Sequence, residues 1–240
     1  MIKPVGLPPL MVVKFDLDPM HRGYFDVIYE RDFLSPLLKL SPQLRSIKRF
    51  ETCALTAQVY PINPFWTFYE LDCEDTLTRT DEIFANPEFS ENLAIFRYHK
   101  ERILNNFSRV NYEPLYNYTR MKAGPGLSGS ADGWRRIEQF DLAPERREEF
   151  FEWYLGQYQN DIQECTPDLA AYHIFQVCGS TPGSVLSVFQ SPLIETLEES
   201  LELLRSKKLG QASPQWQQFC SDGTVVNLEC SALSNFLILP

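Results

Sequence analysis

One stretch of the sequence occurs twice, and this duplication decides the fold. Residues 15–53 read FDLDPMHRGYFDVIYERDFLSPLLKLSPQLRSIKRFETC, and residues 140–178 read FDLAPERREEFFEWYLGQYQNDIQECTPDLAAYHIFQVC. Aligned without a gap at an offset of 125 residues, they share eleven identities in 39 positions, where composition alone gives about two or three. The identical pairs are Phe15/Phe140, Asp16/Asp141, Leu17/Leu142, Pro19/Pro144, Arg22/Arg147, Phe25/Phe150, Tyr29/Tyr154, Pro42/Pro167, Leu44/Leu169, Phe50/Phe175 and Cys53/Cys178. The chain is therefore predicted to contain two copies of one structural unit.

Each copy reads as a strand, a helix and a second strand. Val13, Phe15 and Leu17 alternate with polar residues, as in a half-buried strand. Apolar and aromatic residues then recur at helical spacing in both copies. They are Phe25, Ile28, Tyr29, Phe33, Leu37 and Leu40 in the first copy, and Phe150, Trp153, Tyr154, Tyr158, Ile162 and Cys165 in the second. Pro42 and Pro167 are expected to end these helices, because proline disfavours helical geometry in its predecessor.

The remainder of each copy predicts a third strand, a second helix and a fourth strand. The third strands are expected at 65–72 and 184–190, and the final strands begin near Ser108 and Gly223. Between them, ANPEF at 85–89 matches ASPQW at 212–216. The predicted fold class is α+β, with two tandem ferredoxin-like β-α-β-β-α-β repeats. The expected domains are 1–118 and 134–240, joined by the glycine-rich linker 119–133.

Composition excludes several classes of protein. The chain has 240 residues, with 32 acidic and 22 basic side chains and a net charge of −10, so nucleic acid and anionic membranes are not expected partners. No stretch has the length of a membrane helix or the form of a signal peptide, which predicts a cytoplasmic, soluble protein. The six cysteines form no C-x-x-C pair and are expected to be reduced and mostly buried. No metal site is predicted.

The two tandem units resemble a fused, intramolecular dimeric α+β barrel, a superfamily that includes EthD-like, antibiotic-biosynthesis monooxygenase-like and stress-responsive barrel proteins. The resemblance rests on FFEWY (150–154) and its weaker copy YFDVIY (24–29), on the second strands, and on the turns at ANPEF and ASPQW. Many members with this helix carry a histidine four residues after the tyrosine. The matching positions here are Phe33 and Tyr158, so that histidine's acid-base role does not carry over.

The resemblance implies a cofactor-independent enzyme that acts on a hydrophobic aromatic or polyketide-like small molecule, as a cyclase, isomerase or monooxygenase. The alternatives are a non-catalytic small-molecule-binding or scaffold protein and a haem-binding barrel protein. No cofactor is expected, the ligand is a hydrophobic small molecule, and the pseudo-dimer forms within one chain, with further oligomerisation open. FFEWY and His173 favour the second copy as the site, whereas the aromatic third strand favours the first.

Three residues are candidate catalytic groups. His173 lies mid-strand on a largely apolar face and could act as a general base, although a structural histidine is the commoner case. Tyr69, in FWTFYELD, could donate a hydrogen bond to a developing enolate. His99 lies on a helix among charged residues, and His21 is expected in a solvated first turn. Aromatic residues are the candidate substrate-binding set: Trp66, Phe68, Tyr112, Tyr172 and Trp153.

Two further pairs of charged residues have a structural interpretation. Asp16 and Asp141 are equivalent residues that could share a proton, but Asp before a proline-started helix more often caps or turns the chain. Arg49 and Glu51 are expected to be solvated or to pair with each other. The sequence lacks the G-x-G-x-x-G, Walker, H-E-x-x-H and G-x-S-x-G motifs, so the corresponding nucleotide, zincin and hydrolase functions have no support.

Overall fold

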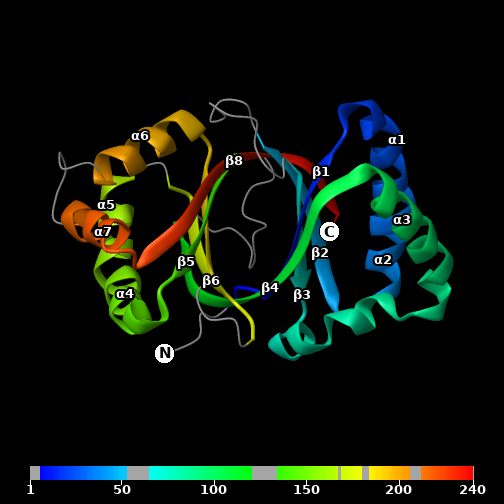
Figure 1. Ribbon diagram of the computed structural model, residues 1–240, viewed down its shortest axis with the longest axis horizontal. Coiled ribbons are helices and arrows are strands. Elements are labelled where there is room, and N and C mark those ends of the chain that lie inside the picture. The colour runs from blue at the N-terminus through cyan, green and yellow to red at the C-terminus, as the bar shows by residue number, and fades with distance from the viewer. Residues whose placement is uncertain are drawn as a thin grey trace. The chain divides into compact units, whose positions relative to one another are not determined.

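A computed structural model describes residues 6–52, 65–120, 134–166, 169–179, 184–205 and 212–239 (Figure 1). The strands of the first copy are β1 (Leu10–Leu17), β2 (Leu44–Thr52), β3 (Phe65–Leu71) and β4 (Leu104–Thr119). Its helical segments are η1 (Pro19–His21), α1 (Arg22–Val27), η2 (Ile28–Leu34), α2 (Ser35–Leu40), η4 (Glu74–Phe84), η5 (Pro87–Phe89) and α3 (Ser90–Ile103). The expected β-α-β-β-α-β order is confirmed in this copy.

The second copy repeats this order. Its strands are β5 (Trp134–Leu142), β6 (Ala171–Val177), β7 (Val185–Ser191) and β8 (Val225–Leu239). Its helical segments are η6 (Pro144–Arg146), α4 (Arg147–Trp153), η7 (Tyr154–Tyr158), α5 (Gln159–Cys165), α6 (Ile194–Arg205) and α7 (Ala212–Ser221). Each copy also has a segment that the repeat did not predict, η4 in the first and α6 in the second, between the third strand and the last helix.

The hydrogen-bonded strand order is β1-β3-β2-β8-β5-β7-β6-β4, and it closes into a barrel because β4 pairs with β1. All strand pairs with a described register are antiparallel. The chain divides into an N-terminal unit, Pro8–Glu113 with Ser234–Pro240, and a C-terminal unit, Pro114–Leu233 with Met1–Leu7. Strands β4 and β8 therefore each contribute to both units. Of the predicted linker 119–133, residues 121–133 lie outside the described part of the chain, so the domain boundaries stay a prediction.

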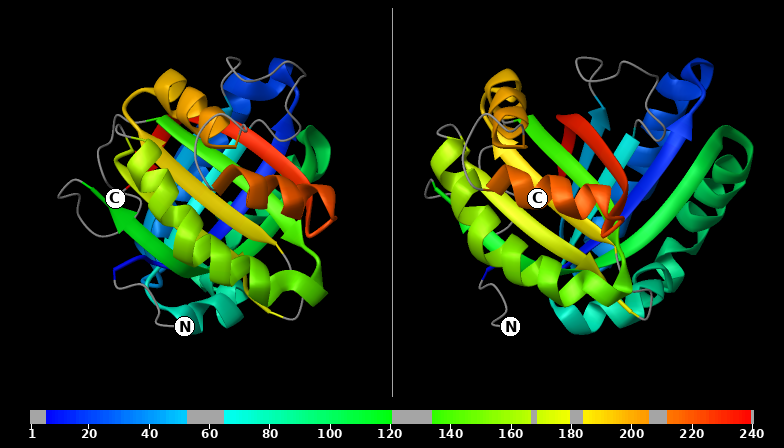
Figure 2. Two further views of the ribbon diagram at one scale, coloured as in Figure 1. Left: turned by 90° about the vertical axis from the view of Figure 1, so that its left-hand side faces the viewer. Right: turned by 60° about the vertical axis from the view of Figure 1, so that its left-hand side comes forward.

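In the N-terminal unit, the helices pack on one face of the sheet (Figure 1). Aromatic side chains fill this layer: Phe15 lies edge-on to Phe25 and Tyr29, at 5.5 and 5.6 Å between ring centroids. The C-terminal unit repeats the arrangement, with Phe140 edge-on to Phe150 and Tyr154. Figure 2 shows the α4–α5 helix of this unit running along the face of its strands. The apolar stripe predicted from helical spacing is thus the buried face of each long helix.

A π-helical segment interrupts the first long helix of both copies at the same place. It covers Ile28–Leu34 in η2 and Tyr154–Tyr158 in η7. Within these segments the rings of residues four apart are stacked, Tyr29 on Phe33 at 5.6 Å and Tyr154 on Tyr158 at 5.0 Å. Such segments are rare in helices and occur often at functional sites.

Asp16 and Asp141 have the structural role that the repeat favoured. Each lies beside a register shift, between Lys14 and Asp16 in β1 and between Gln139 and Asp141 in β5. Asp16 accepts a hydrogen bond from the Asn106 side chain (2.6 Å), and Asp141 accepts one from Asn227 (3.0 Å). Both asparagines have a positive φ, 50° and 53°. The two carboxylates therefore hold equivalent β-bulges and do not cap the helices that follow.

Arg49 is not solvated, and the expectation from the sequence is wrong. Its side chain is fully buried and donates to Asp26 (2.5 Å) and Glu30 (2.7 Å). Glu51 pairs instead with Arg22, at 2.5 Å. Strand alternation failed here because β2 is buried over most of its length on both faces, so a charged residue does not mark a face in contact with water.

The cysteines are free but not mostly buried, which corrects a second expectation. Cys73, Cys220 and Cys230 are exposed, and Cys165 and Cys178 are half-buried. Cys53 lies outside the described residues. Among the helices that the structure describes, none combines the length and apolar character of a membrane span.

Candidate functional site

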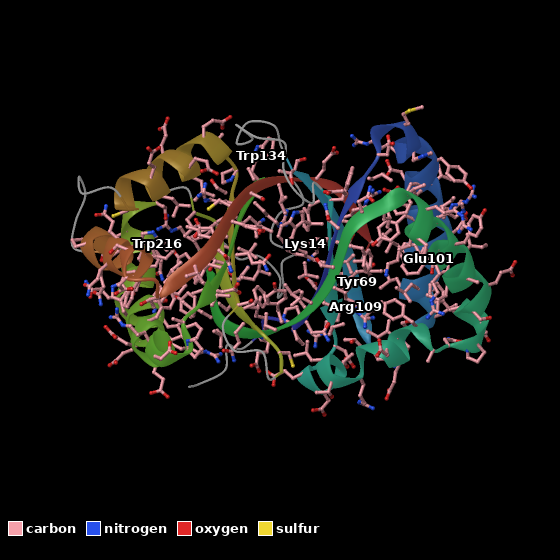
Figure 3. All side chains as sticks on the ribbon, in the orientation of Figure 1. Lys14, Tyr69, Glu101, Arg109, Trp134 and Trp216 are labelled. Carbon is pink, nitrogen blue, oxygen red and sulfur yellow. The ribbon has the colours of Figure 1, made fainter. Side chains whose placement is uncertain are left out.

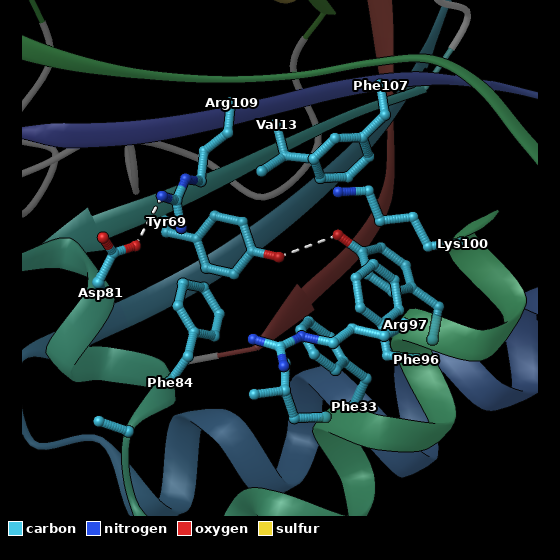
Figure 4. A pocket seen from close by; sticks show the side chains of 13 residues that line it. Val13, Phe33, Tyr69, Asp81, Phe84, Phe96, Arg97, Lys100, Phe107 and Arg109 are labelled. Atoms are coloured by element: carbon cyan, nitrogen blue, oxygen red, sulfur yellow. Dashed lines mark hydrogen bonds and ion pairs between the residues drawn. The ribbon is translucent and has the colours of Figure 1, made fainter.

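A cavity of about 650 Å³ lies in the N-terminal unit between the sheet and its covering helices (Figure 4). Its walls come from β1, β3 and β4 on one side and from η2, η4 and α3 on the other. The lining residues are mostly apolar or aromatic: Val13, Tyr29, Phe33, Tyr69, Asp81, Phe84, Ala85, Leu93, Phe96, Arg97, Lys100, Phe107 and Arg109. A volume of this size accommodates a molecule of several fused rings.

Two buried phenols form the polar part of the cavity floor. The hydroxyls of Tyr29 and Tyr69 lie 2.9 Å apart in a hydrogen bond, and Tyr29 also donates to Thr67 Oγ1 at 3.2 Å. Tyr29 comes from the π-helical segment, while Tyr69 and Thr67 share one face of β3. Helix and sheet therefore meet at a short chain of hydroxyl groups inside an aromatic cavity.

Burial keeps these phenols protonated. Loss of hydration raises the pKa of Tyr69 well above its ordinary value, and the neighbouring Tyr29 raises it further. Loss of hydration also raises the pKa of Tyr29, against the smaller lowering effects of its hydrogen bonds and Arg49. A neutral phenol is a hydrogen-bond donor and a poor base near neutral pH. Tyr69 is thus suited to stabilise an oxyanion and unsuited to remove a proton.

Three cationic side chains surround the rim of the cavity. Arg97 and Lys100 are three residues apart on α3 and share one helix face, and Arg109 comes from β4 (Figure 4). Lys100 Nζ lies 3.6 Å from the centroid of the Phe107 ring. Arg109 pairs with Asp81 at 2.7 Å, and the Asp81 side chain is 87% exposed.

Tyr69 and Arg109 are not conserved between the copies, whereas Tyr29 has a tyrosine counterpart in Tyr154. Equivalent pairing registers match Tyr69 with Phe189, and Arg109 with Cys230. The equivalent prolines Pro87 and Pro214 are 127 residues apart. The equivalent starts of β4 and β8, Leu104 and Val225, are only 121 residues apart. The first copy therefore has six extra residues between the proline and the strand. The extra residues lengthen α3, and this longer helix carries Arg97 and Lys100 to the cavity.

The second copy fills the equivalent layer with a larger side chain. Trp216, the counterpart of Phe89, is 4% exposed and stacks on Tyr158 at 5.5 Å, with 11° between the ring planes. Its indole also lies 6.2 Å from the Tyr154 ring. Figure 3 shows Trp216 in the C-terminal unit, and Tyr69 and Arg109 in the N-terminal unit. Tyr154 keeps the hydroxyl contact of its counterpart Tyr29, because it lies 2.9 Å from Ser187, the counterpart of Thr67.

One of the three candidate catalytic residues, Tyr69, lines the cavity. His99 lies on α3 but not in the cavity lining; its imidazole is 3.3 Å from the Tyr24 hydroxyl. His173 belongs to the C-terminal unit and is 1% exposed. Its neighbours Tyr172 and Ile174 pack into the helix-covered core, so alternation puts His173 on the opposite face of β6.

The candidate substrate-binding residues lie elsewhere than the cavity lining. Trp66 and Phe68 alternate with Tyr69 along β3 and face away from the cavity. Tyr112 shares their face, because it pairs opposite Leu10, which pairs opposite Glu70. Tyr172 and Trp153 are buried in the aromatic core of the C-terminal unit. A substrate-binding role for these five residues stays a prediction.

Sequence reasoning missed the cationic rim and Tyr29 as part of a site. Tyr29 and Phe33 were both assigned to the apolar stripe of the helix, and both line the cavity. The signal for the rim was present in the broken symmetry between the copies. Arg97, Lys100 and Arg109 lie within or after the six-residue insertion of the first copy.

The donor set of the cavity does not favour haem or a metal ion. No histidine is among the residues that line it, although an axial histidine is a common ligand of haem iron. In the part of the chain that the structure describes, no group of three or more His, Cys, Asp or Glu side chains is arranged to hold a metal ion.

Comparison with protein-family models gives no match to this sequence. A search of curated proteins by sequence also gives no match.

Comparison with solved structures finds proteins of the same fold at low identity. An anthrone oxidase-like protein aligns with a TM-score of 0.66 and 12% identity, over 99% of this chain and 94% of the other. A "putative monooxygenase" from Fusobacterium nucleatum subsp. nucleatum aligns with a TM-score of 0.61 and 9% identity, over 98% of this chain and 95% of the other. A second protein of the same name, from Lactobacillus acidophilus, aligns with a TM-score of 0.59 and 10% identity, over 97% of this chain and 96% of the other. The chain thus has the dimeric α+β barrel fold, built from two tandem ferredoxin-like units.

Proposed function

We propose that the cavity of the N-terminal unit is the active site of a monooxygenase-type enzyme that acts on a hydrophobic aromatic or polyketide-like molecule without a bound cofactor. The observation that carries the proposal is the pair of buried phenols, Tyr29 and Tyr69, at the floor of an aromatic cavity of about 650 Å³. The names of the similar structures, anthrone oxidase-like and monooxygenase, support this reaction class.

The reaction class suits a site of this composition. Oxidation of an activated ring methylene by O2 converts CH2 to C=O and releases one water, so that the electrons balance without an added reductant. The substrate must first lose a proton to become an enolate. Tyr29 donates its one hydrogen to Thr67, so Tyr69 is the donor in the bond between the two phenols. When the enolate binds, the neutral Tyr69 hydroxyl can turn that hydrogen to the enolate oxygen, and the apolar walls strengthen the new bond by excluding water.

The proposal is tested by oxygen uptake with anthrone as the probe, beside the spontaneous rate. The wild type is expected to accelerate uptake, and Tyr69→Phe to lower kcat by about 100-fold, as for the loss of one oxyanion donor. The matched control is Tyr154→Phe, which removes an equivalent buried hydroxyl in the C-terminal unit and should leave kcat unchanged.

A non-catalytic binding protein is the second candidate, favoured by the absence of histidine from the lining of the cavity. It predicts saturable binding of anthrone with no acceleration of oxygen uptake. That outcome would reject the enzyme proposal and retain the binding site. Equal loss of activity in Tyr69→Phe and Tyr154→Phe would instead show that the effect is one of stability.

A further inference from the structure

We infer that the molecule bound in the N-terminal cavity carries a carboxylate, which Arg97 and Lys100 hold at the rim while the rings of the ligand lie on the aromatic floor. The inference rests on the proposed site and adds the charge of its ligand. It is carried by the placement of the cationic groups on one helix face at the edge of an apolar cavity.

The local charge runs against the charge of the whole chain. The protein has ten more acidic than basic side chains, yet three cations and one carboxylate line this cavity. The single carboxylate, Asp81, already pairs with Arg109 and is 87% exposed. Arg97 forms no hydrogen bond or ion pair with the described part of the chain. The rim therefore has an excess of positive charge that a bound anion would balance.

The environment of Lys100 points the same way. Its ammonium lies 3.6 Å from the centre of the Phe107 ring, at the boundary between the apolar cavity and solvent. Burial, followed by the positive charges of Arg109 and Arg97, lowers the pKa of Lys100, against the smaller raising effect of Glu101. These cations repel one another, and a carboxylate bound between them and the floor would attract each of them.

The second copy shows that the fold itself does not require these charges. The strand position of Arg109 is Cys230 there, and α7 is four residues shorter than α3, with ten residues against fourteen. That copy also has Trp216 at the position of Phe89, stacked on Tyr158. The cationic rim of the N-terminal cavity is therefore not a requirement of the fold.

The test compares two fluorescent probes with the same rings, anthracene-9-carboxylate and 9-anthracenemethanol, titrated into the full-length protein. The wild type should bind the carboxylate at least about tenfold more tightly than the alcohol, the effect of one favourable charge contact in a partly desolvated site. Added salt should weaken binding of the carboxylate and leave the alcohol unaffected.

Three variants make the test specific. Lys100→Met and Arg97→Met should each remove most of the preference for the carboxylate and change the affinity for the alcohol by less than about twofold. Lys100→Arg should retain the preference. The matched control is Arg102→Met, on the same helix, because Arg102 stacks on Tyr98 at 3.5 Å and does not line the cavity.

The outcomes separate the inference from the proposed function. Equal affinity for the two probes in the wild type, or a preference retained in both Met variants, would overturn the inference. Carboxylate preference without oxygen uptake would support the inference and reject the enzyme. No binding of either probe would reject both the inference and the proposed site.

Discussion

The buried Arg49 cluster allows a quantitative test of how the two copies diverged. In the first copy Arg49 is fully buried and bonds Asp26 and Glu30, whose side chains are 17% and 29% exposed. At the offset of 125 residues, the second copy replaces this ionic cluster with three apolar residues, Ile174, Phe151 and Leu155. Ile174 and Phe151 are buried in the aromatic core of that unit, and Leu155 packs against it. The apolar set is therefore a solution that this fold already accepts.

The expected energies follow from burial. Removing one partner of a buried ion pair costs about 3–5 kcal/mol, and replacing all partners by packed apolar groups is often neutral or stabilising. Arg49→Ile should lower the free energy of unfolding by about 2–3 kcal/mol, because water can reach the remaining carboxylates. Asp26→Phe with Glu30→Leu should cost about 3–5 kcal/mol, because the guanidinium loses both carboxylates in a fully buried position. The triple variant, which combines Arg49→Ile, Asp26→Phe and Glu30→Leu, should have a free energy of unfolding within about 1 kcal/mol of that of the wild type, or higher.

The assay is equilibrium unfolding in urea followed by far-UV circular dichroism, with Arg45→Ile as the control. Arg45 is an exposed arginine on the same strand, bonded only to the Asp72 carbonyl among its described contacts, and its loss should cost less than about 1 kcal/mol. A triple variant as unstable as the sum of its parts would refute the reasoning. So would an Arg49→Ile variant as stable as the control.

Two more predictions concern stability. Burial raises the pKa of Tyr29, Tyr69, Tyr154 and Tyr172, so stability is complete below the unfolded pKa near 10 and falls as the pH rises above it, by up to about 1.4 kcal/mol per pH unit for each tyrosine. Urea midpoints between pH 8 and 11 should show this fall, with a smaller slope in Tyr154→Phe; an unchanged slope would contradict it. Asn106→Ala should lower the free energy of unfolding by about 2 kcal/mol, and Asn106→Gly by about 1 kcal/mol. Both variants lose the hydrogen bond to Asp16, but glycine adopts a φ of 50° without strain. Equal thermal midpoints of the two variants would reject this prediction.

The sequence determined the architecture because a duplication and a periodic pattern are one-dimensional properties. Eleven identities at one offset defined the repeat, and the change from strand to helix periodicity placed β1, the first long helix and β2 in each copy. Pro42 falls just beyond the end of α2 at Leu40. No long-range information was needed for these assignments, since each depends on residues within a few turns or strand positions of one another.

The faces of the strands could not be assigned in the same way. Every residue of β3 and β7 is buried, so alternation no longer separates a face in contact with water from a core face. Strand β2 is also buried over most of its length, and Arg49 on it was expected in solvent although its side chain is fully buried with its carboxylate partners. The same strands made Trp66 and Tyr69 look like neighbours in one site, whereas the pleat directs them to opposite faces.

The tertiary structure alone decided which residues line the cavity of the N-terminal unit. The divergent positions are far apart in the chain, with Tyr69 on β3, Arg97 on α3 and Arg109 on β4, and strand pairing with a longer helix brings them together. In the other copy a larger ring, Trp216, stands at the position of Phe89 and stacks on Tyr158. Whether a cavity exists is a small difference between the volumes of packed side chains, and this difference depends on contacts between distant residues that no local pattern records.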